Sequence, residues 1–318
     1  MDLMIGRNIR TLVIGGGGFI GRSLVCKLAN MGKEVTILGR REPIGLDLSE
    51  YVNYIQGDFA DVELISKLLD NHEEIINLAY ASKPNTSYDN PIADLHDNLT
   101  ATIKLFLEVA VRGLNLIVVS SGGTVYGQTE AFSLSESDPT WPISPYGLTK
   151  LTIEHYAHLY AVTKGLRYTC LRIANAYGVG QEPFVGQGFI STAMALSMQG
   201  RPIKIFGNGD VVRDYVYVDD VAQAICLALL RDKNSGTYNI GSGKGRSIQE
   251  ILATLEPIMG EIGCGLACEY LPERSFDVRR NVLNCSKAHD ELGWAAATEF
   301  NLGLRRTRDW MLEAGYAK

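Results

Sequence analysis

The chain has 318 residues, of which 46% are hydrophobic and 21% are charged, a composition typical of a globular enzyme with about two domains. Its net charge of -6 argues against general nucleic-acid binding, which requires a basic surface. No apolar stretch approaches the length of a membrane span and the N-terminus lacks a signal-like apolar core, so we expect a cytoplasmic protein. The neighbouring Cys264 and Cys268 lack the further ligands of a zinc site, and no metal is expected.

A strand, a glycine turn, a helix and a second strand follow one another between Thr11 and Arg41. Between the strand at 12–14 and the helix at 19–31, Gly15, Gly18 and Gly21 follow the pattern GxxGxxG. The first glycine permits a tight turn, the second lets backbone amides approach a pyrophosphate, and the third lets the helix pack on the strand. The start of the helix, with Phe19 and Ile20, would then face the phosphates. This segment predicts a nicotinamide dinucleotide site.

The second strand, at 34–38, is followed by Gly39, Arg40 and Arg41 in place of the acidic residue that often binds the adenosine ribose. Arginine can hold the extra phosphate of NADP through charge-assisted hydrogen bonds. The expected cofactor is therefore NAD or NADP, with a slight preference for NADP. The alternative for the two arginines is a solvated basic turn.

Strand and helix patterns alternate up to residue 175, which is typical of a parallel sheet covered on both faces. Strands are expected at 11–14, 34–38, 74–78, 116–120 and 168–173, and long helices at 93–112 and 146–163. Beyond residue 175 the pattern is irregular and rich in glycine, as in substrate loops beyond strand ends. We predict an α/β fold with a Rossmann-type doubly wound parallel sheet in residues 1–175, returning near 214–245, and a smaller C-terminal α/β substrate-binding domain in residues 176–318.

Tyr146 and Lys150 are four residues apart, which places them on one face of the predicted helix. The ammonium group of Lys150 would lower the pKa of the tyrosine from its unperturbed value of about 10 and favour a phenolate. Tyr146 would then serve as acid and base, and Lys150 could also hold the nicotinamide ribose. A hydroxyl group from the strand end at 116–120 could bind the reacting oxygen of the substrate.

Five features together resemble the extended short-chain dehydrogenase/reductases: GGGGFIG, Asn98, SSGGTVYG, YGLTK and VRDYVYVDD. The likeness covers nearly the whole chain and is strongest to nucleotide-sugar epimerases and dehydratases of the UDP-galactose 4-epimerase type. The resemblance implies cofactor contacts for Asp58, Phe59, Leu78, Ala79, Asn98 and Ser120. It implies sugar-nucleotide contacts for Asn175 and diphosphate contacts for Arg213 and Arg274, with surface ion pairs as the alternative for the two arginines. It also implies a homodimer through the two long helices, with simple packing on the sheet as the alternative.

Two positions depart from the usual pattern of these epimerases. Gly122 stands where a serine or threonine is typical, so the missing hydroxyl should come from Thr124 or, as second candidate, Ser121. The alternative is that neither compensates and activity is reduced. At the other position, Asn281 replaces a bulky tyrosine that restricts the pocket in related 4-epimerases. The smaller side chain predicts that N-acetylhexosamine nucleotides are accepted.

The activity implied is 4-epimerisation of a UDP-hexose or UDP-N-acetylhexosamine through a transient 4-keto sugar, with Tyr146 moving the hydroxyl proton. An NADPH-dependent reductase of a 4-keto sugar shares these motifs, and Arg40 and Arg41 favour it. A 4,6-dehydratase is less favoured, because residues 122–124 lack acidic and basic groups. A nucleotide-binding regulatory protein without catalysis is favoured only by Gly122.

Overall fold

The structure is a computed structural model that describes residues 9–41, 51–231, 236–273 and 278–317. Its largest sheet consists of seven parallel strands. The strand order is β10-β6-β5-β4-β1-β2-β3, so the direction of winding reverses between β1 and β4. The strands are β1 (Arg10–Ile14), β2 (Glu34–Gly39), β3 (Val52–Gln56), β4 (Glu74–Asn77), β5 (Asn115–Ser121), β6 (Arg167–Ile173) and β10 (Gly236–Ile240). The doubly wound fold is confirmed. All five expected strands are present, β10 lies in the range 214–245 where the chain was expected to return to this sheet, and β3 is additional.

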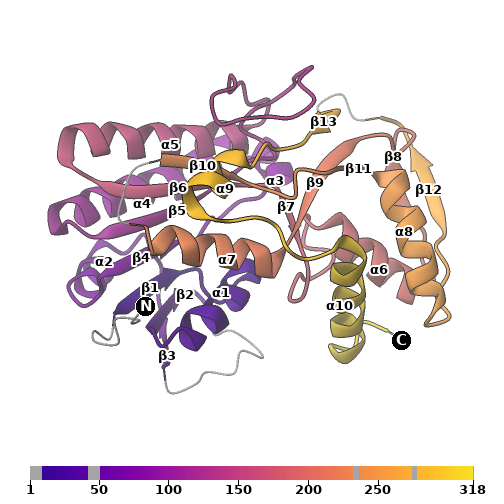
Figure 1. Ribbon diagram of the computed structural model, residues 1–318, viewed down its shortest axis with the longest axis horizontal. Helices are drawn as coiled ribbons and strands as arrows, with labels where there is room; N and C mark the ends of the chain where they lie inside the picture. Colours follow the sequence, from indigo (N-terminus) through magenta and orange to yellow (C-terminus); the bar gives the residue numbers. More distant parts are fainter. Residues whose placement is uncertain (1–8, 42–50, 232–235, 274–277, 318) are drawn as a thin grey trace.

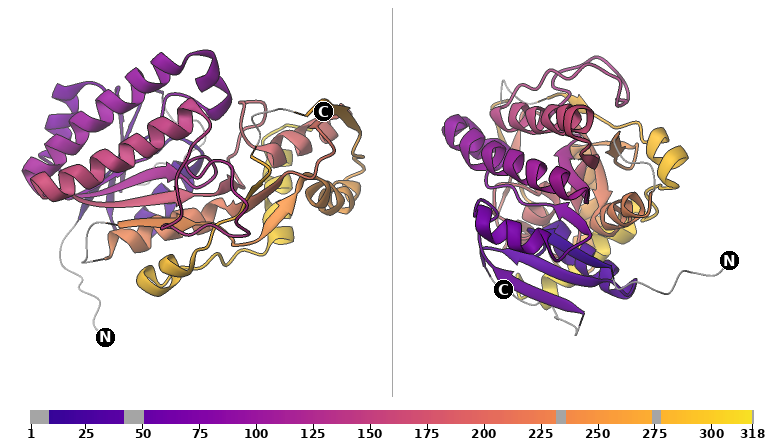
Figure 2. Two further views of the ribbon diagram at one scale, coloured as in Figure 1. Left: turned by 90° about the horizontal axis from the view of Figure 1, so that it is seen from above. Right: turned by 90° about the vertical axis from the view of Figure 1, so that its left-hand side faces the viewer.

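Helices cover both faces of this sheet (Figures 1 and 2). One face carries α1 (Phe19–Asn30) and α7 (Val218–Leu229), and the other carries α2 (Val62–Leu69), α4 (Pro91–Arg112) and α5 (Pro145–Lys164). The alternation of side chains along each strand explains both layers. In β1, Val13 packs towards α1, whereas Leu12 and Ile14 pack towards α4. The two long helices expected from the sequence correspond to α4 and α5.

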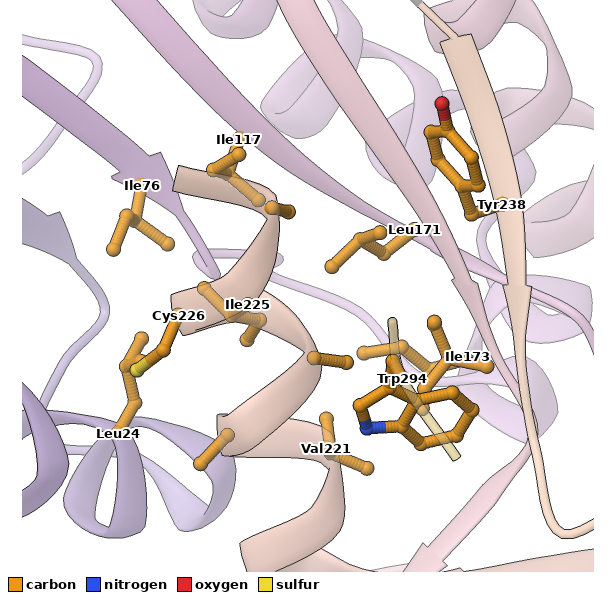
Figure 3. Close-up of a cluster of buried hydrophobic side chains, with 14 of the residues drawn as sticks. Leu24, Ile76, Ile117, Leu171, Ile173, Val221, Ile225, Cys226, Tyr238 and Trp294 are labelled. Carbon is orange, nitrogen blue, oxygen red and sulfur yellow. The ribbon is translucent and has the colours of Figure 1, made fainter. Parts of the chain in front are cut away.

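The C-terminal part of the chain contributes to the core of the large sheet. Figure 3 shows Trp294 beside Ile173 and Val221, on the side of the sheet that α7 covers. The indole is buried, and its Nε1 donates a hydrogen bond of 2.9 Å to the carbonyl oxygen of Asp220. The segment around α9 (Ser286–Leu292) is thereby fixed against the dinucleotide-type sheet.

A second, smaller α/β layer lies beyond the carboxyl ends of β5 and β6, on the right of Figure 1. Its sheets are built from β7 (Asn175–Tyr177), β9 (Val212–Tyr217), β11 (Gly245–Ser247) and β13 (Arg280–Asn281), and from β8 (Ile203–Phe206) with β12 (Cys268–Leu271). The helices are α6 (Phe189–Met198), α8 (Ile248–Gly260) and α10 (Phe300–Glu313), while the short α3 (Pro84–Asp89) precedes α4. The division at residue 175 into two domains stays a prediction. Of the helices within the described ranges, none combines the length and apolar character that a bilayer crossing requires.

Candidate functional site

The turn between β1 and α1 requires glycine for steric reasons. Gly15 has a φ of +81°, and a Cβ at this position would lie 3.0 Å from the backbone nitrogen of Ala79. A Cβ at Gly21 would lie 2.4 Å from the carbonyl oxygen of Gly16, so only glycine lets α1 approach the turn this closely. Gly18 is the N-cap of α1. The turn and the helix N-terminus therefore fit a bound pyrophosphate.

Leu78 and Ala79 lie against this turn, at the end of β4. The backbone nitrogen of Leu78 donates a hydrogen bond of 2.9 Å to the carbonyl oxygen of Ile14, and that of Ala79 donates one of 3.1 Å to Asn77 Oδ1. Asn98 is buried in α4, where its Oδ1 accepts a hydrogen bond of 2.7 Å from the backbone nitrogen of Ala81. Asn98 thus holds the loop after β4 in place.

The expected adenosine side of the site lies at the ends of β2 and β3. Arg40 and Arg41 are exposed, and the carbonyl oxygen of Arg40 accepts a hydrogen bond of 3.2 Å from Gln56 Nε2. Asp58 is also exposed and caps its own turn by accepting a hydrogen bond of 2.9 Å from the backbone nitrogen of Ala60. Phe59 is half-buried against the core on the α4 side.

A pocket of about 450 Å³ lies where the ends of β5 and β6 meet β7, α6 and β9. The residues singled out from the sequence that line it are Phe19, Ile20, Ser120, Ser121, Thr124, Tyr146, Asn175 and Arg213. The start of the cofactor-type helix α1 and the start of α5 therefore meet at one cavity between the two layers. This position, at the carboxyl ends of parallel strands, is where open α/β sheets bind ligands.

Tyr146 faces this pocket because α5 begins just before it. Ser144 is the N-cap, whose Oγ accepts a hydrogen bond of 3.1 Å from the backbone nitrogen of Gly147, and Pro145 occupies the first turn. One turn later, the buried Lys150 donates from Nζ to the carbonyl oxygen of Val119 at 2.9 Å. Its Nζ lies 5.7 Å from the centroid of the Tyr146 ring.

The predicted direction of the Tyr146 pKa is wrong for the protein by itself. Burial, and secondarily the charge of Asp94, raise the pKa of Tyr146 above its ordinary value. Burial also lowers the pKa of Lys150 to about 8. The cost of removing both groups from water exceeds the effect of their proximity, because Lys150 directs its ammonium group to a carbonyl oxygen instead of the phenol.

The turn after β5 explains the glycine at position 122. A Cβ on Gly122 would lie 2.5 Å from Leu283 Cδ1 and 3.0 Å from the carbonyl oxygen of Arg172, so a side chain here would collide with the core. Ser121 and Thr124 line the pocket instead. The hydroxyl oxygen of Thr124 is buried and has no hydrogen-bond partner among the described residues. An unsatisfied polar atom at a pocket wall indicates a place for a polar ligand group.

Asn281 does not have the expected position on the pocket wall. It is buried, and its Nδ2 donates a hydrogen bond of 2.9 Å to the carbonyl oxygen of Gly122, which supports the turn from below. Three residues before Asn281 in the chain, Val278 lines the pocket, whereas Asn281 is not among the described residues that line it. The pairing of β13 with β9 and the hydrogen bond to Gly122 direct the Asn281 side chain to the turn after β5. Arg274 lies outside the described residues.

Arg213 and Asn175 reach the pocket from β9 and β7. The guanidinium Nη1 of Arg213 donates a hydrogen bond of 2.9 Å to the carbonyl oxygen of Val212. Gln181, which the sequence reading missed, also lines the pocket, and its Nε2 donates to the carbonyl oxygen of Ala176 at 2.9 Å. Its buried Oε1 has no partner within the described part of the chain. The one signal in the sequence was that Gln181 follows Asn175 by six residues, in the segment expected to bind substrate.

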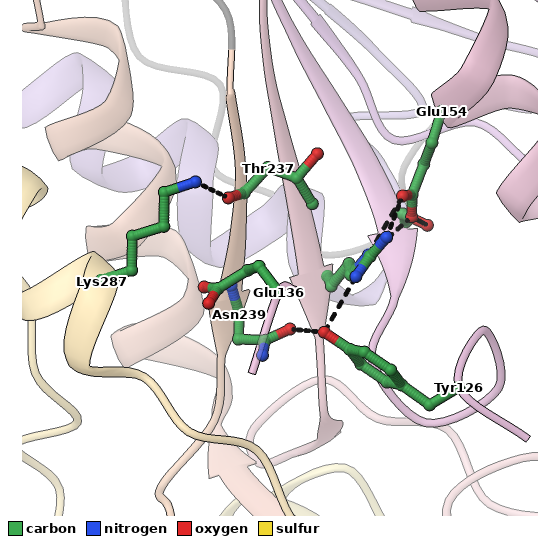
Figure 4. Close-up of polar contacts among 8 residues, drawn as sticks. Tyr126, Glu136, Glu154, Thr237, Asn239 and Lys287 are labelled. Atoms are coloured by element: carbon green, nitrogen blue, oxygen red, sulfur yellow. Dashed lines mark hydrogen bonds and ion pairs between the residues drawn. The ribbon is translucent and has the colours of Figure 1, made fainter. Parts of the chain in front are cut away.

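A buried polar network beneath the turn was also missed. Arg172 forms hydrogen bonds to both carboxylate oxygens of Glu154, the closest at 2.7 Å, and Ser120 donates to the same carboxylate. Arg172 also donates to the hydroxyl oxygen of Tyr126, which in turn donates to Asn239 Oδ1 at 2.7 Å (Figure 4). The hydroxyl of Ser120, expected beside the cofactor, is therefore engaged by Glu154. Glu154 follows Lys150 by four residues, a spacing that placed it on the same helix face.

Comparison with known proteins identifies the family. Residues 11–241 match the model described as the NAD dependent epimerase/dehydratase family. A protein named putative UDP-glucose 4-epimerase from Methanocaldococcus jannaschii is 35% identical, with 94% of this chain and 97% of the relative covered. The Thermotoga maritima UDP-glucose 4-epimerase, solved with UDP-glucose, superposes with a TM-score of 0.89 at 31% identity, covering 96% of this chain and 99% of that one.

A second solved structure, the UDP-glucose 4-epimerase of Thermus thermophilus in complex with NAD, gives a TM-score of 0.88 at 30% identity, with 96% and 100% of the two chains covered. These findings confirm the resemblance drawn from the glycine turn and YGLTK, and they support a nicotinamide cofactor. The chain belongs to the NAD-dependent epimerase/dehydratase family.

Proposed function

We propose that this protein is a nucleotide-sugar 4-epimerase that acts on a UDP-linked hexose or N-acetylhexosamine. The observation that carries the proposal is the convergence of Tyr146, Ser121 and Thr124 on the pocket that also receives the start of α1. Relatives and solved neighbours named UDP-glucose 4-epimerase support the same reaction class. Asn281 no longer supports acceptance of an N-acetyl group, so both sugar classes belong in the test.

The glycine turn, with Phe19 and Ile20 at the start of α1, would hold the diphosphate of the cofactor. When bound, the oxidised nicotinamide supplies a hydride-accepting ring and a positive charge. We propose NAD as the working cofactor, because the solved Thermus thermophilus epimerase contains NAD. Exposed Arg40 and Arg41 would add only a capacity to bind the extra phosphate of NADP. Titration with both cofactors should give tighter binding of NAD, and a lower Kd for NADP would overturn this choice.

Tyr146 is the group we assign to proton transfer at the sugar C4 hydroxyl. It takes the hydroxyl proton as a 4-keto sugar forms, and returns a proton when the opposite face of that sugar is reduced. Since burial raises the pKa of Tyr146 in the protein by itself, the phenolate needs added positive charge in the site. The ammonium group of Lys150 contributes part of that charge.

Thr124 and Ser121 are the hydroxyls we assign to the sugar oxygen. Thr124 is the stronger candidate, because its oxygen is buried and lacks a partner among the residues described. Asn175 and Arg213 enter the same pocket from the second layer, where a guanidinium suits a diphosphate. Arg274 stays a prediction for the same task.

Incubation of purified protein with UDP-glucose or UDP-N-acetylglucosamine and NAD, followed by NMR, tests the proposal. The expected product is the C4 epimer, with no net change in absorbance of the reduced nicotinamide. Steady cofactor consumption with a 4-keto sugar would make the protein a reductase, and a 4-keto-6-deoxy product would make it a dehydratase. Binding without turnover across the panel would favour a regulatory role.

We also propose a homodimer through α4 and α5, which lie side by side on the outside of the sheet (Figures 1 and 2). Large apolar side chains stay exposed on these helices: Ile92, Leu95, Val111, Leu148, Leu159 and Val162. Light scattering should give twice the 34.9 kDa mass of the chain, and Val162→Asp should shift the mass towards the monomer. A monomeric wild-type protein would contradict the proposal.

A further inference from the structure

The ring of Tyr80 lies beside both members of the Tyr146–Lys150 pair. Its centroid is 4.9 Å from that of the Tyr146 ring, with an interplanar angle of 68° in an edge-to-face contact. The Nζ atom of Lys150 lies 3.9 Å from the centroid of the Tyr80 ring, closer than its 5.7 Å distance from the Tyr146 ring. Tyr80 is therefore the shared neighbour of the two groups assigned to chemistry.

Asp94 holds this ring from α4. The carboxylate is buried and accepts hydrogen bonds from Thr149 Oγ1 at 2.6 Å and from the hydroxyl of Ser82. The hydroxyl of Tyr80 points to the same carboxylate at 3.4 and 3.5 Å. Since Thr149 precedes Lys150 on α5, one carboxylate connects the loop after β4 with the helix that carries the catalytic pair.

The backbone next to Tyr80 is also fixed on both sides. Ala79 lies against Gly15 of the cofactor-type turn, and the backbone nitrogen of Ala81 donates to Asn98 Oδ1 at 2.7 Å. Asn98 Nδ2 donates in turn to the carbonyl oxygen of Asp94 at 2.7 Å. The ring is thus held between the glycine turn and α5, with little freedom to leave Lys150.

Lys150 needs such a neighbour because its charge is buried. Within the described ranges it forms no salt bridge, and its only hydrogen bond is to the carbonyl oxygen of Val119. The face of an aromatic ring carries negative potential and attracts a desolvated ammonium group. Tyr80 supplies that potential at 3.9 Å.

We propose that Tyr80 is a positioning residue of the catalytic pair: its ring stabilises the Lys150 ammonium group and sets the orientation of the Tyr146 phenol, while Asp94 fixes the ring. This inference rests on the proposed function for the role of Tyr146. Tyr80 is not among the described residues that line the pocket. Its replacement should therefore change the turnover rate and the ionisation of Lys150, and leave the affinity for the substrate unchanged.

The first test follows the ionisation of Lys150 by NMR in protein labelled with ¹³C-lysine, with Lys150→Met to assign the signal. Burial lowers the pKa of Lys150 to about 8, and this pKa should fall by about one further unit in Tyr80→Leu, which keeps a large apolar side chain but loses the aromatic face. Tyr80→Phe should recover most of this shift, because the ring remains. An unchanged titration in Tyr80→Leu would overturn the proposal, and this readout needs no substrate, so it is independent of the proposed function.

The second test is the kinetic profile. In Tyr80→Leu, kcat should fall about tenfold, as expected for a misplaced catalytic group, while the KM of the nucleotide sugar stays the same and the alkaline limb moves to lower pH. Tyr270→Leu, in the exposed Tyr270 of β12, is the matched control and should behave as the wild type. A rise in KM with unchanged kcat would contradict the positioning role.

If Tyr80→Leu does not fold, Asp94→Asn tests whether the cluster of Tyr80 and Asp94 acts on Lys150. This change preserves the shape of the side chain and removes the negative charge that favours the Lys150 ammonium group. The Lys150 titration should again move to lower pH. A titration identical to that of the wild type would show that the cluster does not act on Lys150.

Discussion

The two buried cations Arg172 and Lys150 have different surroundings. Arg172 in β6 has a hydrogen-bond partner at each of its three guanidinium nitrogens, supplied by both oxygens of Glu154 and the hydroxyl of Tyr126. Lys150 in α5 has a carbonyl oxygen and an aromatic ring. Burial opposes both charges, but hydrogen bonds with Glu154 raise the pKa of Arg172, whereas burial lowers the pKa of Lys150 to about 8.

The difference in partners distinguishes a charge that stabilises the fold from a charge that can interact with a bound ligand. A buried cation that is paired with a carboxylate stabilises one arrangement of the chain only as long as this partner stays in place. A buried cation without a carboxylate partner retains a protonation equilibrium near physiological pH, which a bound cofactor or a reacting phenol can use. The Glu154–Arg172 pair therefore stabilises the fold, whereas Lys150 has the protonation equilibrium that the proposed reaction requires.

The largest effect expected from this comparison concerns Tyr146, the partner of Lys150 in the proposed reaction. Tyr146→Phe removes the hydroxyl to which we assign the proton transfer, so epimerisation kcat should fall about 1,000-fold. The melting temperature should stay close to that of the wild type, because the phenol belongs to no described hydrogen-bonded pair that supports the fold. NMR turnover assays and thermal unfolding measure the two quantities. Retained turnover in this variant would remove Tyr146 from the mechanism.

The next effect concerns the buried ion pair of Glu154 and Arg172. Glu154→Gln leaves Arg172 buried without its counter-charge, which should lower the free energy of unfolding by about 3–5 kcal/mol. Urea denaturation measures this change. The matched control is Glu108→Gln in the more exposed pair with Arg112, where the loss should stay below about 1 kcal/mol. Equal losses in the two variants would erase the distinction between buried and exposed pairs.

A smaller effect of opposite sign is expected for Lys150→Met. The pKa of Lys150 is about 8 in the folded chain and ordinarily 10.5, so the folded state binds the proton less tightly than the unfolded state. At pH 7 the variant should be more stable by about 2–3 kcal/mol. The advantage should shrink as pH rises from 8 to about 10.5, where the wild type gains stability because only its unfolded state still carries the proton.

Urea denaturation of both proteins across this pH range measures the difference. A destabilised Lys150→Met at pH 7 would mean that the carbonyl oxygen and the Tyr80 ring satisfy the ammonium group as fully as Glu154 satisfies Arg172. The two cations would then be equivalent, and the comparison would fail.

Short-range sterics and periodicity determined much of the architecture from the sequence. The glycine spacing at 15, 18 and 21 predicts a turn that a Cβ would block, and the structure has that turn. Short apolar runs predict buried strands such as β1 and β5, and apolar residues at helical spacing predict the long helices α4 and α5. The four-residue spacing then suffices to bring Tyr146 and Lys150 to one side of a helix.

Only the tertiary structure decided how these residues are used. Asn281 supports the carbonyl of Gly122 from a position 159 residues away, and Leu283 fills the space that a side chain at position 122 would need. Tyr80 in the loop after β4 contacts Lys150, and Asp94 in α4 contacts Thr149, because the folded chain brings both segments against α5. The pKa of Tyr146 rises where its spacing from Lys150 predicted a fall. Desolvation and Coulomb interactions depend on every neighbour in space, and sequence spacing records only the neighbours along the chain.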